Sequence, residues 1–145
     1  MAKSTPLTGM MGDWRRAGVA VTLLALAACG PDETISGFAG TERTWALVSL
    51  DGVPWSERAT LTFPEAGQVA GAAPCNRFTA SQSAPYPWIE IGPIAATRLA
   101  CPALEAEGIY LTMLGEMAVA EVVGDVLRLT REDGSGEMVF EAVRP

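Results

Sequence analysis

The residues of this chain best suited to chemistry lie in two short stretches, 74–78 and 97–102. Each stretch contains one cysteine, Cys75 or Cys101, and the third cysteine, Cys29, lies far upstream. A pair of cysteines can form a disulfide, supply a nucleophilic thiol or bind a metal ion. The other side chains and the compartment in which the chain folds decide between these possibilities.

The composition argues against catalysis and against metal binding. The sequence has no histidine, so a cysteine nucleophile would lack its usual activating base. A structural zinc site takes four ligands that are mostly cysteine or histidine, and only Cys75 and Cys101 are candidates of those types. A glycosidase needs two acids facing each other across a cleft, whereas the adjacent acids here lie in a helix start and in a turn. We therefore expect no enzyme, no cofactor and no metal ion.

Residues 1–28 have the organisation of a lipoprotein signal peptide. Arg15 and Arg16 precede an uncharged, mostly apolar segment, 17–26, which is too short to span a bilayer. Leucine and two alanines then lead to Cys29, a pattern that resembles the bacterial lipobox, whose cysteine receives the lipid. A plain secretory signal that happens to precede a cysteine is the alternative.

Lipidation of Cys29 would attach the protein to a membrane. Each buried methylene group contributes roughly 0.8 kcal/mol, so two or three palmitate-like acyl chains would hold it permanently. By analogy with Gram-negative lipoproteins, Gly30 does not retain the protein in the inner membrane, and we expect the periplasmic face of the outer membrane. Residues 29–40 are polar and small, and we expect a flexible tether there.

Export would place Cys75 and Cys101 in an oxidising compartment. Two remaining cysteines of a small domain most often form a disulfide under those conditions, and we expect one here. The bond would close a loop of about 26 residues and stabilise the fold by roughly 3–4 kcal/mol in the chain-entropy model. Unpaired thiols are the alternative.

Polar residues flank both cysteines. Asn76 is suited to a left-handed or turn conformation and to hydrogen bonds with nearby backbone. Arg98 can bridge backbone carbonyls or a carboxylate with its planar guanidinium group. Contact with an anion or a partner is the alternative for Arg77 and Arg98, and Thr97 belongs to the same group of candidate contacts. Trp55, in a loop after a proline, is the aromatic residue whose burial is least expected.

The charge balance excludes one class of partner. Residues 29–145 contain seven arginines against sixteen Asp and Glu, a net charge of −9. A chain this acidic is repelled by phosphate backbones, so we expect no nucleic-acid partner.

The hydrophobic pattern predicts an α+β fold that is mainly β. Apolar and polar residues alternate in short segments, with Leu61 and Phe63 on one face of 59–63 and Leu127 and Leu129 on one face of 126–130. The remaining predicted strands are 44–50, 68–71, 86–91, with Trp88 inward, 119–123 and the last strand, with Met138, Phe140 and Ala142 inward. One helix, about 102–118, carries an apolar stripe of Leu104, Gly108, Leu111, Leu114 and Ala118. We expect a compact antiparallel sheet of short strands wrapped against this helix.

Several segments together resemble the META/HslJ-like domain over about residues 41–143, within a predicted domain of 41–145. They are 45–47, 50–52, 61–63, Gly71, 75–78, Ile94, 97–101 and 110–111. The chain departs from the family at Pro74 and Ala80, where glycine is usual or frequent. The resemblance implies a compact β-rich envelope domain, often a lipoprotein, that is associated with heat-shock or stress phenotypes and has no established catalytic activity.

The sequence thus predicts a non-enzymatic exported lipoprotein that serves stress tolerance as a binding or structural module. Its expected partners are the membrane, through Cys29, and an envelope protein or small molecule. The alternative is a lipoprotein inhibitor of a hydrolase such as lysozyme, for which residues 54–56 would form the contact loop.

Overall fold

The computed structural model describes residues 1–4 and 30–144. Cys29 and most of the predicted signal peptide lie outside the described residues. Within the part of the chain that is described, nine strands form one antiparallel sheet, accompanied by two helices. No helix in that part is long and apolar enough to cross a membrane. The predicted fold class, α+β and mainly β, is confirmed.

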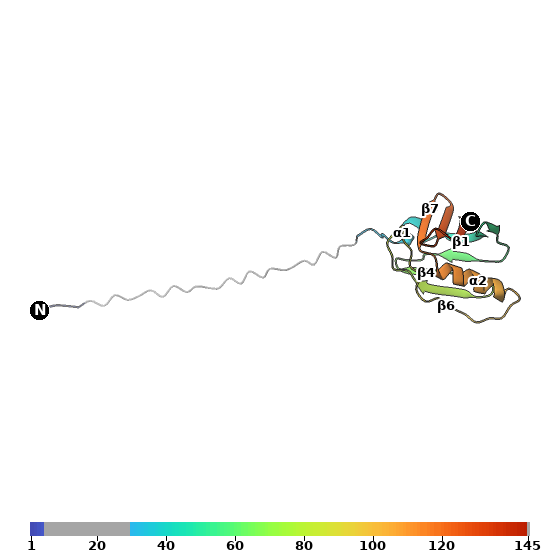
Figure 1. The fold of residues 1–145 in the computed structure, drawn as a ribbon. Coiled ribbons are helices and arrows are strands. Elements are labelled where there is room, and N and C mark those ends of the chain that lie inside the picture. The colour runs from blue at the N-terminus through green and yellow to red at the C-terminus, as the bar shows by residue number, and fades with distance from the viewer. Residues whose placement is uncertain (5–29, 145) are drawn as a thin grey trace.

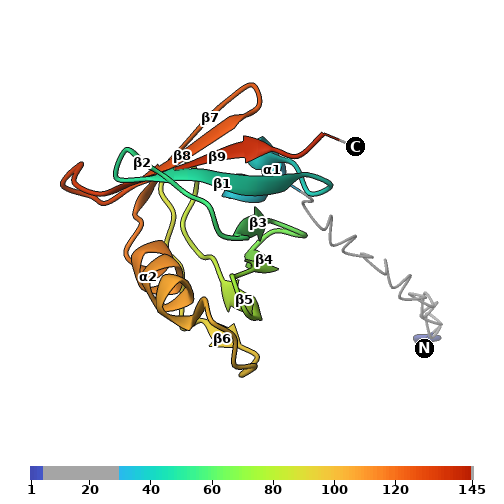
Figure 2. The same cartoon turned by 90° about the vertical axis from the view of Figure 1, so that its right-hand side faces the viewer.

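The elements follow one another in a simple order. They are α1 (Ile35–Ala39), β1 (Thr44–Leu50), β2 (Val53–Pro54), β3 (Thr60–Thr62), β4 (Gln68–Ala72), β5 (Arg77–Ser81), β6 (Ala95–Ala96), α2 (Leu104–Gly115), β7 (Val119–Val123), β8 (Val126–Thr130) and β9 (Glu137–Ala142). The spatial order of the sheet is β6-β5-β4-β3-β1-β9-β8-β7, and β2 pairs with β1. Figure 1 labels β6, β4, β1 and β7 of this series. Strands β3 to β6 descend from β1 beside α2, so the sheet curves partly around the helix (Figure 2).

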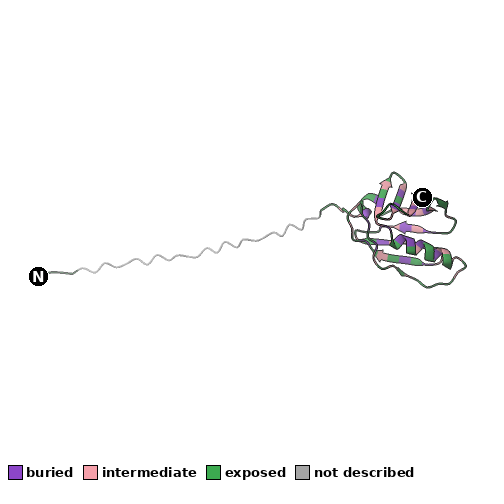
Figure 3. Cartoon of the chain, in the orientation of Figure 1, coloured by how far each residue is buried: buried purple, intermediate pink, exposed green. Residues whose placement is uncertain are grey.

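The core is built from alternating side chains of these strands. Leu61, Phe63, Leu127, Leu129 and Phe140 are fully buried, as the alternation predicted. The charged residue between the two leucines of β8 is exposed. The buried positions of β1, β8 and β9 alternate with intermediate or exposed ones, and Figure 3 colours the three classes along the chain. Period-two patterning therefore placed the inward face of these strands correctly.

Helix α2 buries a face that agrees with the predicted stripe only in part, at Leu114 and at the partly buried Leu111. Glu107, Tyr110, Met113 and Leu114 are buried, whereas Leu104, which began the predicted stripe, is 45% exposed. The helix is also shorter than the predicted 102–118. The inward face is set by Tyr110 and Leu114, at i and i+4, and Glu107 lies one turn before them. A hydrophobicity pattern does not place a glutamate inside, so the burial of Glu107 was missed.

The predicted tether is wrong for its second half. Residues 35–39 form α1, and Ile35 and Ala39 are 1% and 0% exposed. The Glu33 carbonyl accepts a hydrogen bond from the Tyr86 N–H at 2.8 Å, and Thr34 forms a β-bridge with Pro85. The packed part of the chain therefore begins at about residue 33, before the predicted domain boundary at 41.

Asp32 holds the chain that leads into α1. Its carboxylate accepts hydrogen bonds from the Thr34 N–H at 2.9 Å, the Thr34 hydroxyl at 2.7 Å and the Ser36 hydroxyl at 2.5 Å. The hydrogen bonds from Ser36 and Thr34 lower the pKa of Asp32. Because its folded-state pKa is lowered, the stability that Asp32 contributes is present above the unfolded-state pKa and decreases as the pH falls.

Residues 86–91 do not form the predicted strand. They make isolated bridges only, from Trp88 to Val119 and from Ile91 to Gln82. Trp88, predicted to point inward, is 52% exposed, whereas Ile89 is buried. An irregular segment does not follow the period-two rule on which the inward assignment of Trp88 depended.

Gly71 allows three strands to pack closely. A Cβ atom at this position of β4 would overlap the carbonyl oxygen of Thr60 in β3 and approach the Phe78 ring of β5 to 2.8 Å. A side chain of any size would therefore displace backbone. This contact gives a physical reason for the glycine in the sequence pattern.

Candidate functional site

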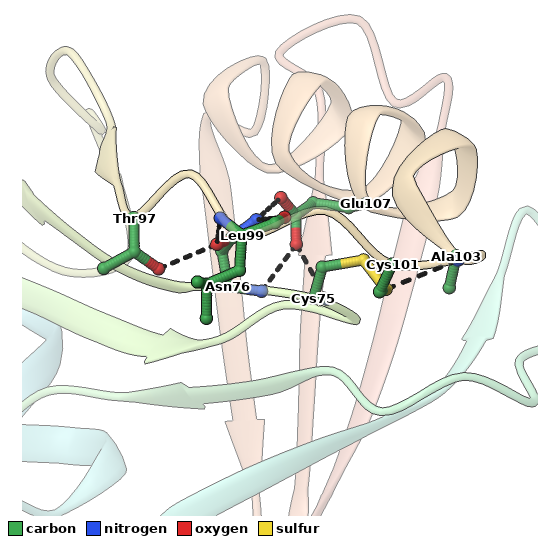
Figure 4. The surroundings of a disulfide bond; sticks show 7 residues. All are labelled: Cys75, Asn76, Thr97, Leu99, Cys101, Ala103 and Glu107. Carbon is green, nitrogen blue, oxygen red and sulfur yellow. Dashed lines mark hydrogen bonds between the residues drawn. A yellow bond between two sulfur atoms is a disulfide. The ribbon is translucent and has the colours of Figure 1, made fainter.

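The two cysteine-containing stretches meet at one end of α2. Cys75 and Cys101 form a disulfide with a Cα–Cα distance of 5.7 Å, as predicted. That distance lies within the usual range for disulfides. The bond joins the turn between β4 and β5 to the segment just before α2 (Figure 4). It therefore fixes the start of the helix to the sheet.

Glu107 is a buried carboxylate beside this disulfide. It lies in the first turn of α2 and is 6% exposed. Its Oε2 accepts hydrogen bonds from the backbone N–H groups of Cys75 and Asn76, both at 2.8 Å, and its Oε1 accepts one from Asn76 Nδ2 at 2.6 Å. A carboxylate near a helix N-terminus is also favoured by the helix dipole. Three N–H donors thus replace the water that Glu107 loses on burial.

Asn76 uses the whole hydrogen-bonding capacity of its side chain. Besides Glu107, Nδ2 donates to the Leu99 carbonyl at 3.1 Å. Its Oδ1 accepts from the Leu99 N–H at 2.7 Å and from the Thr97 hydroxyl at 2.8 Å. A primary amide offers two donors and two acceptor lone pairs, and all four are used. We refer to Asn76, Thr97, Leu99 and Glu107 as the Asn76 network (Figure 4).

The structural role predicted for Asn76 is therefore present, although its backbone does not adopt the left-handed conformation. Thr97 contributes through its hydroxyl oxygen, which also accepts the Arg77 N–H at 3.2 Å. Arg77 and Arg98 are exposed, and within residues 30–144 neither guanidinium group forms an ion pair. The carboxylate bridge considered for Arg98 is not observed in that part of the chain.

Trp55 is half-buried and packs toward the core. Its ring lies 6.4 Å from that of Tyr110, between centroids. Its Nε1 is buried and has no hydrogen-bond partner among the residues that the structure describes. A tryptophan in this position is not a protruding anchor. The loop at 54–56 therefore offers no exposed aromatic side chain to a hydrolase.

Glu107 is the member of the site that sequence reasoning missed. The type and position of Glu107 favour a solvated acid near a helix start and do not indicate burial. Its spacing of three and seven residues from Tyr110 and Leu114 places it on their face and was the available signal. Leu99 contributes backbone atoms only, so its type carried no signal at all.

The buried polar groups of the site are engaged in structural bonds. The Tyr110 hydroxyl donates to the Thr60 carbonyl at 3.1 Å, and burial raises the pKa of Tyr110 well above its usual value.

Within residues 1–4 and 30–144, no three His, Cys, Asp or Glu side chains gather as metal ligands would. A groove of about 590 Å³ runs along the outer side of α2, where Leu104, Ile109 and Arg131 line it.

Together these features define a small disulfide-linked domain, in which a curved antiparallel sheet carries a docked helix fastened by a buried polar network. The chain belongs to the META domain family, because the family model of the META domain matches residues 36–144. This finding confirms the resemblance seen in the sequence.

Three solved structures share the fold. An NMR structure of a Burkholderia xenovorans protein is 17% identical, with full coverage of both chains and a TM-score of 0.58. A second NMR structure is 20% identical over 70% of this chain and 89% of the other, with a TM-score of 0.55. The crystal structure of a DUF4847 family protein from Bacteroides vulgatus is 14% identical over 68% of this chain and 90% of the other, also with a TM-score of 0.55. No curated protein matches the sequence.

Proposed function

We propose that this META domain protein is an exported lipoprotein, anchored through Cys29 to the periplasmic face of the outer membrane. It acts there as a non-enzymatic binding or structural module that contributes to stress tolerance. Its partner is an envelope protein or a small molecule, and the shallow, open groove along α2 is a surface that either could contact.

The Cys75–Cys101 disulfide is the observation that carries the proposal. Disulfides form and persist in oxidising compartments and are rare in the cytosol of most organisms. A chain that needs this bond to hold α2 against its sheet is suited to the cell envelope. The apolar segment that ends at Cys29 gives a route to that compartment.

The non-enzymatic role is supported by the bonds that the side chains suited to catalysis already form within the protein. The cysteines are joined to each other, Glu107 accepts three N–H groups, and Tyr110 is a buried donor. Each group that could act as a nucleophile, acid or base at this site thus has a structural partner. In this arrangement the side chains stabilise the fold and are not free to act on a substrate.

Replacing Cys29 by serine should abolish membrane anchoring. Serine has no thiol to receive the lipid, so the variant is expected to stay as uncleaved precursor or to appear in the soluble fraction. Metabolic labelling with palmitate and density-gradient separation of the two membranes measure the effect. Gly30→Ala is the matched control, since it keeps a small residue beside an intact Cys29 and should leave anchoring unchanged. Wild-type cleavage and fractionation of Cys29→Ser would contradict the lipoprotein assignment.

The purified protein should show no turnover with esterase, protease, glycosidase or phosphatase substrates. The reason is the absence of histidine from the sequence and the engagement of Cys75, Cys101 and Glu107. Product formation is measured with chromogenic panels at several protein concentrations. Activity that scales with protein and disappears when one carboxylate is replaced by its amide would refute the non-enzymatic role.

A further inference from the structure

An aromatic surface lies beside the point where the chain enters the domain. Phe38 is on the outer side of α1 and is 51% exposed, whereas Ile35 and Ala39 of the same helix are buried. The Phe38 ring stacks on the Tyr86 ring at 4.0 Å between centroids, with 16° between their planes. We refer to Phe38 and Tyr86 as the aromatic pair. Helix α1, which carries Phe38, lies at the β7 side of the domain (Figure 1).

The aromatic pair is held in place from two sides. The Tyr86 N–H donates to the Glu33 carbonyl at 2.8 Å, which ties it to the chain that leads into α1. The Tyr86 hydroxyl accepts the Val122 N–H of β7 at 3.3 Å. The exposed Phe38 ring therefore rests on a support fixed to the sheet, rather than on a free loop.

The distance from this surface to Cys29 is short. Within residues 30–144, Glu33 is the first residue with a backbone hydrogen bond to the rest of the domain, and it follows Cys29 by four positions. Four residues span at most about 14 Å when fully extended. An anchor at Cys29 would hold the α1 end of the domain within that distance of the membrane surface.

We propose that the aromatic pair is a membrane-contact site, in which Phe38 enters the headgroup region of the leaflet that holds the lipid anchor. This inference rests on the proposed lipidation of Cys29. Aromatic rings are favoured at the membrane–water interface. Glu33 is exposed nearby and the chain is acidic, so attraction to anionic lipids does not drive the contact. The contact depends on apolar burial and suits a leaflet rich in phosphatidylethanolamine.

The test uses the full lipidated chain with a photoreactive benzoylphenylalanine at position 38. The matched control carries it at position 99, where Leu99 is 66% exposed in the segment that follows β6, at the end of the domain away from α1 (Figure 2). Each protein is reconstituted into phosphatidylethanolamine vesicles with a small share of phosphatidylglycerol. We expect several-fold more lipid adduct at position 38 than at position 99, at both low and high salt.

Mass spectrometry of the N-terminal peptide separates the two possible failures. Equal adduct yields at both positions, or adducts at position 38 with protein instead of lipid, would overturn the membrane contact. If Cys29 is lipidated in that experiment, the proposed function still stands. A Cys29 without lipid would overturn both the membrane contact and the proposed function.

Hydrogen exchange provides a second measure that does not need the photoreactive label. Amides of 33–40 should exchange several-fold more slowly in vesicle-bound wild type than in soluble Cys29→Ser protein, and equal rates would also refute the contact.

Discussion

Replacing both Cys75 and Cys101 by alanine should lower the free energy of unfolding by about 3.5 kcal/mol, the chain-entropy value for a loop of this length. The two cysteines are 26 positions apart, and the loop between them contains β5 and β6. Without the bond, the unfolded chain gains the conformations that loop closure had removed. A domain of this size has about 5–15 kcal/mol of stability in total, so the loss is a large share.

Urea unfolding of wild type and the double variant measures this difference, with the reductant as an internal control. Reductant should shift the wild-type midpoint toward that of the double variant and leave the double variant unchanged. Two titratable thiols in the native wild-type protein would contradict the bond itself. Equal midpoints for oxidised wild type and the double variant would show that the bond forms without stabilising the fold.

The sheet could be predicted from the sequence because its strands obey a simple rule. Leu61 and Phe63, or Leu127 and Leu129, alternate with polar residues, and one face of a sheet must be buried. The rule fails where the backbone is irregular, as at Trp88, or where a short helix is buried by tertiary contacts, as at Ile35. Five residues of helix have little intrinsic stability, so α1 depends on its packing against the rest of the domain.

The candidate site could be predicted only in part. The disulfide between the two cysteines could be predicted, because an oxidising compartment and the number of cysteines leave few other uses for two thiols. The backbone contacts of Asn76 follow from its chemistry, although their partners do not. The burial of Glu107 could not be derived from residue type, because a glutamate enters a core only where donors from distant segments converge on it.

The Asn76 network and the disulfide fasten the same parts of the chain. Both join the turn after β4 to α2, and the network also includes Thr97 and Leu99 from the segment between β6 and α2. The covalent bond limits the unfolded state, whereas the network acts in the folded state by pairing groups that have lost water. Because they act on different states, we expect the network to be needed even with the disulfide intact.

Asn76→Asp is therefore expected to destabilise the oxidised protein by about 3–5 kcal/mol, the cost of leaving a charge unpaired inside a protein. The substitution replaces Nδ2, which donates to Glu107 Oε1 and to the Leu99 carbonyl, by an oxygen that repels both. Gln68→Glu is the matched control. Gln68 also donates its amide to a carboxylate, that of Glu65, but it is exposed. This surface change should cost no more than about 0.5 kcal/mol.

A compensating substitution at residue 107 tests whether the loss of stability in Asn76→Asp arises from the contact with Glu107 or from any change at position 76. In the double variant Asn76→Asp/Glu107→Gln, the charge moves from residue 107 to residue 76, and the amide introduced at position 107 can donate to the carboxylate introduced at position 76. The amide oxygen at position 107 can still accept the backbone N–H groups of residues 75 and 76, so the double variant should be more stable than Asn76→Asp alone. A coupling of about 0.5–3 kcal/mol is expected for residues in one hydrogen-bond network. Urea unfolding of the four proteins of this cycle measures the coupling. Additive losses would show that Asn76 and Glu107 act independently, and that the buried glutamate is held by the backbone donors alone.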